Sequence, residues 1–414
     1  MIIRRHHVGG LAVAGLLVAA IAGCGADPTA DARSTITADG CIENYSADVD
    51  YFRDKAEAEY AQGWSVSYAK SYKVLRTTVE AAGGHANAGS RRIESTYVLN
   101  QCGAPEPELT GELAGAEVIT IPTKTVADGG SVLYAALERL DVAESLVGQA
   151  EQFIGPTEAP YFPKISAQIK SGKVADLGYD VNLEALAEAD PDFYTNYAGD
   201  QAMFAKIKEL GIPVVYYFPY TESPLGAAEQ IKFTSLFFNR EAAANAVFDP
   251  IEQRYQALER TVSGQVPDEK DRPSVLVGVI GKSGEVTTNQ NDRFEEQLIR
   301  AAGGTALPDL PGGGKATLSL ESFLDLGADA DFWLDLVFFP QYASKSEYLA
   351  ADPRLDVLKA LHTGDTFHRI GPRGQDYFLN GAIDADVMLT DAVSLLHPDL
   401  APDHELVYLG TVSD

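Results

Sequence analysis

The sequence predicts an α/β protein with two parallel-sheet lobes, joined by a long helical connection and preceded by a small β-rich extension. A short cassette occurs twice, at 183–193 and at 320–332, each time as a Leu-Glu pair, an acidic turn and a phenylalanine. Strand-like apolar runs alternate with helix-like runs around both copies, as in parallel sheets. The stretch 223–263 between them stays compatible with helix. Two similar halves predict two lobes that face one another, an arrangement that commonly binds ligands.

The N-terminus resembles a bacterial lipoprotein export signal over residues 1–23. Two arginines precede an apolar run at 8–22, and small residues lead directly to Cys24. The run is short and rich in alanine and glycine, which disfavours the alternative of a transmembrane anchor. Lipid on Cys24 would hold the mature protein on the outer face of the membrane, and stable anchoring takes more than one acyl chain. The small polar residues at 24–37 predict a flexible tether.

The composition predicts a globular protein and argues against nucleic acid as a partner. The 414 residues are 45% hydrophobic and 22% charged, which is enough for two cores. The formal charge of −28 would repel a phosphate backbone. Such a surface mainly provides solvation, and it could also steer the protein toward a basic docking surface.

An extension is expected over 38–115. Alternating patterns predict strands at 64–68, 73–79 and 92–99. Apart from the signal cysteine, the chain has Cys41 and Cys102, and an oxidising compartment favours a disulfide between them over two free buried thiols.

The N-terminal lobe is expected over 116–222. The apolar strand at 116–122, followed by a glycine-containing loop and an amphipathic helix, predicts the opening βα unit. The elements expected in order are strand 116–122, helix 132–140, cassette strand 193–197, helix 202–210 and strand 211–217.

The helical connection is expected over 223–263. Ser223-Pro224 combines a capping hydroxyl with a first-turn proline, which is typical of a helix start. Asn239 is expected to cap a second helix, and Pro250 to kink it because proline lacks a backbone donor. Residues 264–272 form the predicted linker.

The C-terminal lobe, at 273–414, repeats the order of the first. The elements expected are strand 274–280, helix 293–302, cassette strand 332–339, strand 366–370 and a final helix.

This arrangement resembles the helical-backbone class of ABC-transporter substrate-binding proteins, periplasmic-binding-protein class III, which captures ferric siderophores, haem and cobalamin. The resemblance covers roughly 116–400, and the segment 222–226 with the Cys41 to Cys102 extension resembles an iron-siderophore subgroup. The motifs that carry it, in order, are Val118 to Pro122, Asn182-Leu183-Glu184, Asp190-Pro191-Asp192, Gly211-Ile212-Pro213-Val214, Arg300-Ala301-Ala302-Gly303-Gly304, Leu318-Ser319-Leu320-Glu321 and His397-Pro398-Asp399-Leu400.

The resemblance implies that Glu184 and Glu321 dock on arginines of a membrane permease, one from each lobe. Two equivalent acids early in helices at the lobe rims could both meet a twofold-symmetric basic partner. The alternative is that each acid only stabilises its helix through the dipole. The implied partners are the permease dimer with its ATPase and a ferric siderophore-like small molecule. The protein itself is expected to be a monomer without a cofactor.

Candidate ligand residues are those in loops beyond the strand ends, where sites in α/β lobes lie. Lysine and arginine suit an anionic ferric chelate, and tyrosine offers a flat face with a polar tip. Ordinary packing is the alternative for each. The candidates are Lys124, Tyr161 and Tyr197 in the first lobe, and Asn289, Gln290, Lys315, Tyr342, Arg373 and Tyr377 in the second.

No motif predicts an enzyme or a metal site held by the protein. The histidines are widely spread, without ligand spacing, and no nucleophile elbow or zinc-protease motif occurs. The sequence therefore predicts a binding protein that captures an iron chelate and delivers it to a permease. The alternatives are a haem or cobalamin receptor of the same class, or an exported enzyme or chelate reductase on this fold.

Overall fold

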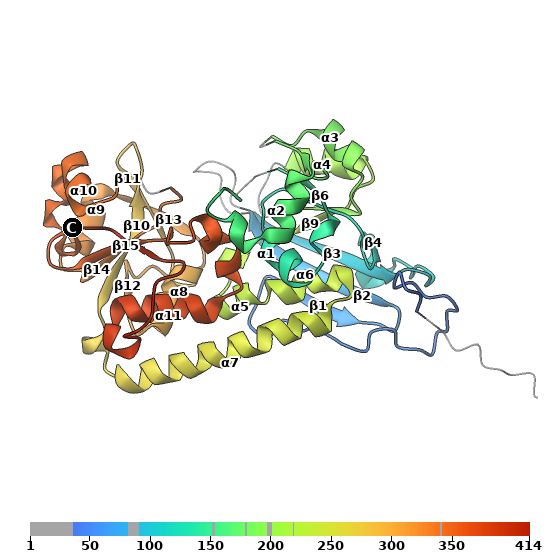
Figure 1. The fold of residues 1–414 in the computed structure, drawn as a ribbon, viewed down its shortest axis with the longest axis horizontal. Coiled ribbons are helices and arrows are strands. Elements are labelled where there is room, and N and C mark those ends of the chain that lie inside the picture. Colours follow the sequence, from blue (N-terminus) through green and yellow to red (C-terminus); the bar gives the residue numbers. More distant parts are fainter. Residues whose placement is uncertain are drawn as a thin grey trace, which may run out of the picture.

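The computed structural model describes residues 36–81, 91–150, 154–178, 180–196, 201–217, 219–339 and 342–414. Two lobes lie side by side, and the long helix α7 (Glu241–Gln265) runs along both of them (Figure 1). The predicted signal at 1–23, Cys24 and Tyr197 lie outside the described residues. The predicted architecture of two α/β lobes, a helical connection and N-terminal strands is confirmed.

The extension contains a sheet with the order β1-β2-β3-β4. Its strands are β1 (Trp64–Tyr68), β2 (Tyr72–Ala81), β3 (Arg91–Gln101) and β4 (Glu117–Ile121). The first three pair antiparallel, and β4 lies parallel to β3. The prediction that the strand at 116–122 opens the first lobe is therefore wrong, because an apolar run indicates a buried strand but not its partner. A disulfide joins Cys41 to Cys102, just after β3.

The N-terminal lobe is built on a parallel sheet with the order β7-β6-β5-β8-β9. Its strands are β5 (Val126–Asp128), β6 (Leu146–Gln149), β7 (Ala175–Asp176), β8 (Phe193–Asn196) and β9 (Val214–Tyr216). Its helices are α1 (Tyr134–Arg139), α2 (Pro163–Lys170), α3 (Leu183–Ala189) and α4 (Gln201–Glu209).

The C-terminal lobe has a parallel centre and antiparallel margins. Strands β12, β10, β14 and β15 run parallel, whereas β11, β13 and β16 join the sheet antiparallel. The strands are β10 (Ser274–Ile280), β11 (Glu285–Asn289), β12 (Thr305–Leu307), β13 (Lys315–Ser319), β14 (Phe332–Asp335), β15 (Asp365–His368) and β16 (Gly410–Thr411). The helices are α8 (Phe294–Ala301), α9 (Leu320–Gly327), α10 (Lys345–Ala351) and α11 (Ala385–Leu396).

The repeated cassette has the same structural role in both lobes. Asp192 accepts hydrogen bonds from the backbone N–H groups of Lys124 (2.6 Å) and Thr125 (2.9 Å), directly before β5. Asp331 accepts from the N–H and the hydroxyl of Ser274, the first residue of β10, both at 2.9 Å. Each aspartate therefore ties the start of its own strand, β8 or β14, to the start of the parallel neighbour.

The connection consists of α5 (Pro224–Ala228), α6 (Gln230–Phe238) and α7. Ser223 caps α5 by accepting from the Gly226 N–H at 3.1 Å. Asn239 does not cap α7 as expected; it ends α6 in the left-handed region, with φ 51°. Helix α7 continues through Pro250. In the described part of the chain, no helix combines the length and the apolar character that crossing a bilayer would require.

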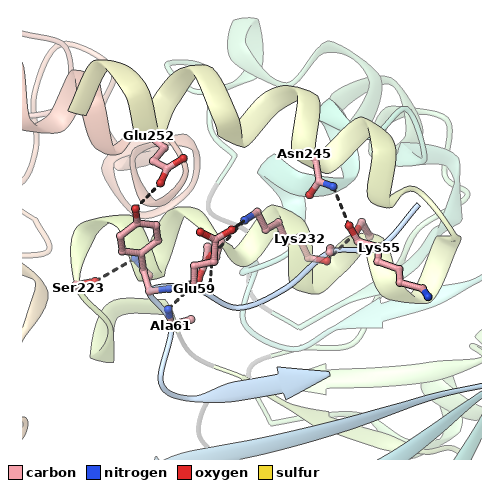
Figure 2. Close-up of polar contacts among 12 residues, drawn as sticks. Lys55, Glu59, Ala61, Ser223, Lys232, Asn245 and Glu252 are labelled. Carbon is pink, nitrogen blue, oxygen red and sulfur yellow. Dashed lines mark hydrogen bonds and ion pairs between the residues drawn. The ribbon is translucent and has the colours of Figure 1, made fainter. Parts of the chain in front are cut away.

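Two buried acids, one just before the connection and one between α5 and α6, hold the extension in place. Glu229 accepts from the consecutive backbone N–H groups of residues 59–61 at 2.8 to 2.9 Å, and Glu222 accepts from those of residues 62 and 63 at 2.8 and 2.6 Å. Figure 2 shows this segment of the extension beside Lys232 on α6, with Asn245 and Glu252 on α7 above it in the view. Backbone donors that would be costly to bury unpaired are thereby satisfied.

A second buried contact joins the extension sheet to the start of α7. The Lys73 side chain is fully buried, and its ammonium group forms an ion pair with Glu241. The same group donates to the carbonyl of Leu236 at 2.7 Å and to Asn239 at 2.8 Å. Apolar packing continues from Trp64, edge-on to Phe233, into a core shared with both lobes. The extension is thus an integral part of the fold.

Candidate functional site

The loops beyond the carboxyl ends of the parallel strands bring the two lobes into contact. Glu158 of the N-terminal lobe accepts from the backbone N–H of Gln375 at 2.9 Å. The guanidinium of Arg373 lies 3.7 Å from the ring centre of Tyr161, which belongs to the same N-terminal loop as Glu158. Tyr220 donates to the carbonyl of Tyr377 at 2.5 Å. Side chains from both lobes therefore line this face together.

Aromatic rings are exposed on the C-terminal side of this face. Phe338 and Phe339, which follow β14, are 47% and 68% exposed. Phe338 stacks on Phe378 with ring centres 4.7 Å apart. The guanidinium of Arg369 lies 5.0 Å from the centre of Phe338 and 5.1 Å from that of Phe378. Exposed rings beside a cation form a surface suited to flat or aromatic ligands.

Arg369 forms an ion pair with an acid on α8. Its guanidinium pairs with Glu295 at 2.8 Å, and the side chain is 11% exposed. Glu295 also accepts from the amide of Asn289 at 3.1 Å and from the Tyr377 hydroxyl at 3.4 Å. Burial favours a raised pKa for Glu295, but the charges of Arg369 and Arg293 outweigh burial and lower the pKa.

Two further cations lie on the C-terminal side of this face. Arg293 precedes α8, and Lys315 pairs in register with Asn289 across β11 and β13. Within the resolved parts of the structure, neither cation lies within ion-pairing distance of an acid. Lys315 is exposed as a residue, yet its pKa is lowered. Desolvation by the surrounding protein is the main cause, and the charges of Arg293 and Arg369 add to it. This side of the face thus holds two cations without an ion-pair partner among the described residues, which favours anionic ligands.

The family model described as "Periplasmic binding protein" matches residues 134–368, more than half of the sequence. The chain belongs to the periplasmic binding protein family. Two lipoproteins of Methanocaldococcus jannaschii are similar to it. One is 27% identical over 73% of this chain and 72% of its own length, and the other is 24% identical over 86% and 88%.

Solved structures share the fold at low sequence identity. A periplasmic haem-binding protein of Pseudomonas aeruginosa aligns with a TM-score of 0.52 at 15% identity, covering 70% of this chain and 99% of that one. A triscatecholate siderophore-binding protein of Bacillus subtilis, solved with ferri-bacillibactin, aligns with a TM-score of 0.51 at 16% identity, covering 68% and 94%. This periplasmic binding protein therefore has the fold that the sequence resemblance implied.

Most of the predicted ligand residues gather at the lobe contact. Tyr161, Arg373, Tyr377, Asn289 and Lys315 all lie there, although Tyr377 and Asn289 are buried. Sequence reasoning missed Arg369, Glu295 and the Phe338–Phe339 pair. Arg369 directly follows the predicted strand at 366–370, and the two phenylalanines were assigned to a strand that ends earlier, at Asp335.

Three predicted ligand residues have other positions. Gln290 accepts from the Gly314 N–H at 2.8 Å and shapes the adjoining loop. Tyr342 packs on Tyr348 with ring centres 4.7 Å apart, within the C-terminal core. Lys124 precedes β5, at the amino end of the sheet, and borders a hollow of about 950 Å³ between the extension and the α6–α7 turn. Lys124 was expected in a loop beyond the carboxyl end of a lobe strand. Because β4 pairs with β3 in the extension sheet, Lys124 instead lies before the first strand of the lobe, and this expectation is corrected.

The two predicted docking acids occupy equivalent positions. Glu184 and Glu321 are each the second residue of a helix, α3 and α9, and both are exposed. The helices lie on different lobes, away from α7 (Figure 1). Over the described ranges, neither acid forms an ion pair within 4 Å. In the same ranges, no group of three or more His, Cys, Asp or Glu side chains is placed to hold a metal ion.

Proposed function

We propose that this protein is the extracytoplasmic receptor of an ABC importer, and that it captures an iron chelate, a ferric siderophore, between its lobes. The observation that carries the proposal is the combination, where the lobes meet, of exposed aromatic rings and of cations that form no ion pair among the described residues. Phe338, Phe339 and Tyr161 offer flat faces, and Lys315 and Arg293 offer positive charge. An anionic chelate with aromatic or planar donor groups matches both features.

Delivery would use the two exposed acids on the lobe rims. Glu184 and Glu321 would pair with basic groups of a permease dimer, one acid for each half of the partner. The relatives named lipoproteins support a lipid on Cys24, which would keep the receptor beside the permease. The receptor would act as a monomer, without a cofactor of its own.

Haem is the second candidate ligand, because a planar macrocycle with two carboxylates also suits exposed phenylalanines beside cations. A solved protein of this fold binds haem.

The test is a titration of the purified protein with a ferric tris-catecholate, a ferric trihydroxamate, haem and cobalamin, followed by the fluorescence of Trp64, Trp333 and the tyrosines. We expect saturable quenching by one ferric chelate, with the ligand recovered unchanged. Saturation by haem alone would select the second candidate. Reduction or conversion of the ligand, or the absence of binding to all four, would contradict the proposal.

A further inference from the structure

Two neighbouring acids at the start of α8 have opposite surroundings. Glu295 and Glu296 are 2% and 1% exposed. Glu295 has a cation, an amide and a hydroxyl around its carboxylate. Among the described residues, neither oxygen of Glu296 has a hydrogen-bond partner, and no cation lies within 4 Å of it. An ionised carboxylate is very costly to bury without a partner, so a proton on Glu296 is the favoured state.

The groups around Glu296 favour the same state. Burial, followed by the charge of Glu295, raises the pKa of Glu296 to about 8, against weaker opposing effects of its own N–H, Asn289 and Arg293. Helices α5, α7 and α11 and strand β12 also pack against α8, and none of their groups is among these influences.

We propose that Glu296 is a neutral acid that sets the charge of the ligand site and so tunes its selection of anionic chelates; this inference rests on the proposed function. With Glu296 neutral, the three cations Arg293, Lys315 and Arg369 are opposed by the carboxylate of Glu295 and by Asp335, which lies near Arg369. Ionisation of Glu296 adds one negative charge and so removes one unit of the excess positive charge. Glu296 touches no ligand in this scheme; it acts through the field at Arg293 and Glu295, with which it interacts.

The test compares Glu296→Gln with Glu295→Gln, the same chemical change at adjacent positions. The first measurement needs no ligand: the Tm of each variant from pH 5 to 9. A raised folded pKa means that the stability contributed by neutral Glu296 is complete below the unfolded pKa and is lost as pH rises through about 8. The Tm of Glu296→Gln should therefore gain on the wild type as pH rises and level off above pH 8. Glu295→Gln should be lower than the wild type throughout, because it leaves Arg369 without its counter-ion.

The second measurement is affinity for a ferric tris-catecholate and for a neutral ferric trihydroxamate at pH 7 and 9. Wild-type affinity for the anionic chelate should fall about fivefold, and the neutral chelate should show no such fall. In Glu296→Gln the ratio of the two anionic affinities should return to one. A Tm difference that is flat with pH, or an unchanged ratio, would overturn the inference. Lack of binding by the wild type would instead refute the proposed function and the selective role together, while the Tm series would still report the ionisation of Glu296.

Discussion

In the N-terminal lobe, the acid at the carboxyl end of the central strand β5 is turned inward, whereas the C-terminal lobe presents cations at the same end of its sheet. Asp128 is fully buried and accepts from the N–H groups of Gly130 and Leu133 at 2.9 and 2.8 Å. Lys315 and Arg293 have no such internal partner among the described residues. The lobes share a scaffold, but charge available to a ligand is concentrated on one of them.

The two lobes resemble each other more closely in their backbone scaffold than in their surfaces. Asp192 and Asp331 perform the same backbone tie in both lobes, and Glu184 and Glu321 occupy the same helical position. A repeated motif therefore reports on architecture, and it also carries the proposal of a symmetric partner. It says little about the ligand, which in the proposed function would contact the two lobes through different loops.

The largest difference in stability between the two halves is expected from removing the buried lysine that links the extension to the N-terminal side. Lys73→Met should lower the free energy of unfolding by about 3 to 5 kcal/mol, because it leaves Glu241 buried without its counter-ion. The measurement is urea unfolding. Lys345→Met in the other lobe is the control, since the acids that it pairs with are 67% and 97% exposed. Equal losses would show that burial of the Lys73 pair is unimportant.

A smaller effect is expected from the paired aspartates. Asp331→Asn should cost about 1 to 2 kcal/mol at pH 7, and Asp192→Asn less, because Asp331 also pairs with Lys359 at 2.6 Å. Burial opposes the lowered pKa of Asp331, and the contacts with Lys359 and Ser274 produce it. A lowered folded pKa gives stability that is present above the unfolded value and is lost as pH falls. The gap between Asp331→Asn and the wild type should therefore close in unfolding curves recorded toward pH 3; a constant gap would contradict this account.

The smallest effect on stability is expected from the docking acids. Changing Glu184 and Glu321 together to lysine should leave Tm and chelate affinity unchanged and abolish uptake by cells, because both acids are exposed. The matched control reverses Glu188 and Asp325, exposed acids on the same helices. Uptake lost equally in both pairs would point to general surface charge, and lost affinity would refute the docking role.

Much of the fold could be predicted because it depends on local pattern. The run at 274–280 is β10, and the helical stretch from 223 joins the lobes. Pairing between distant segments was not encoded locally, so the strand at 116–122 was given to the wrong sheet. Glu295 and Arg369 were missed for the same reason: 74 positions separate them, and only the fold makes them neighbours.

One turn of α7 has consequences for how the lobes can move. Glu252 and Gln256 both bind the hydroxyl of Tyr60 in the extension, and Arg254 between them pairs with Asp386 on α11 of the other lobe at 2.5 Å. A single helical turn thus serves as a shared anchor for the disulfide-bonded extension and the far half of the molecule. Swinging the lobes apart would have to disturb that anchor, so ligand exchange should rely on loop rearrangement more than on a wide hinge.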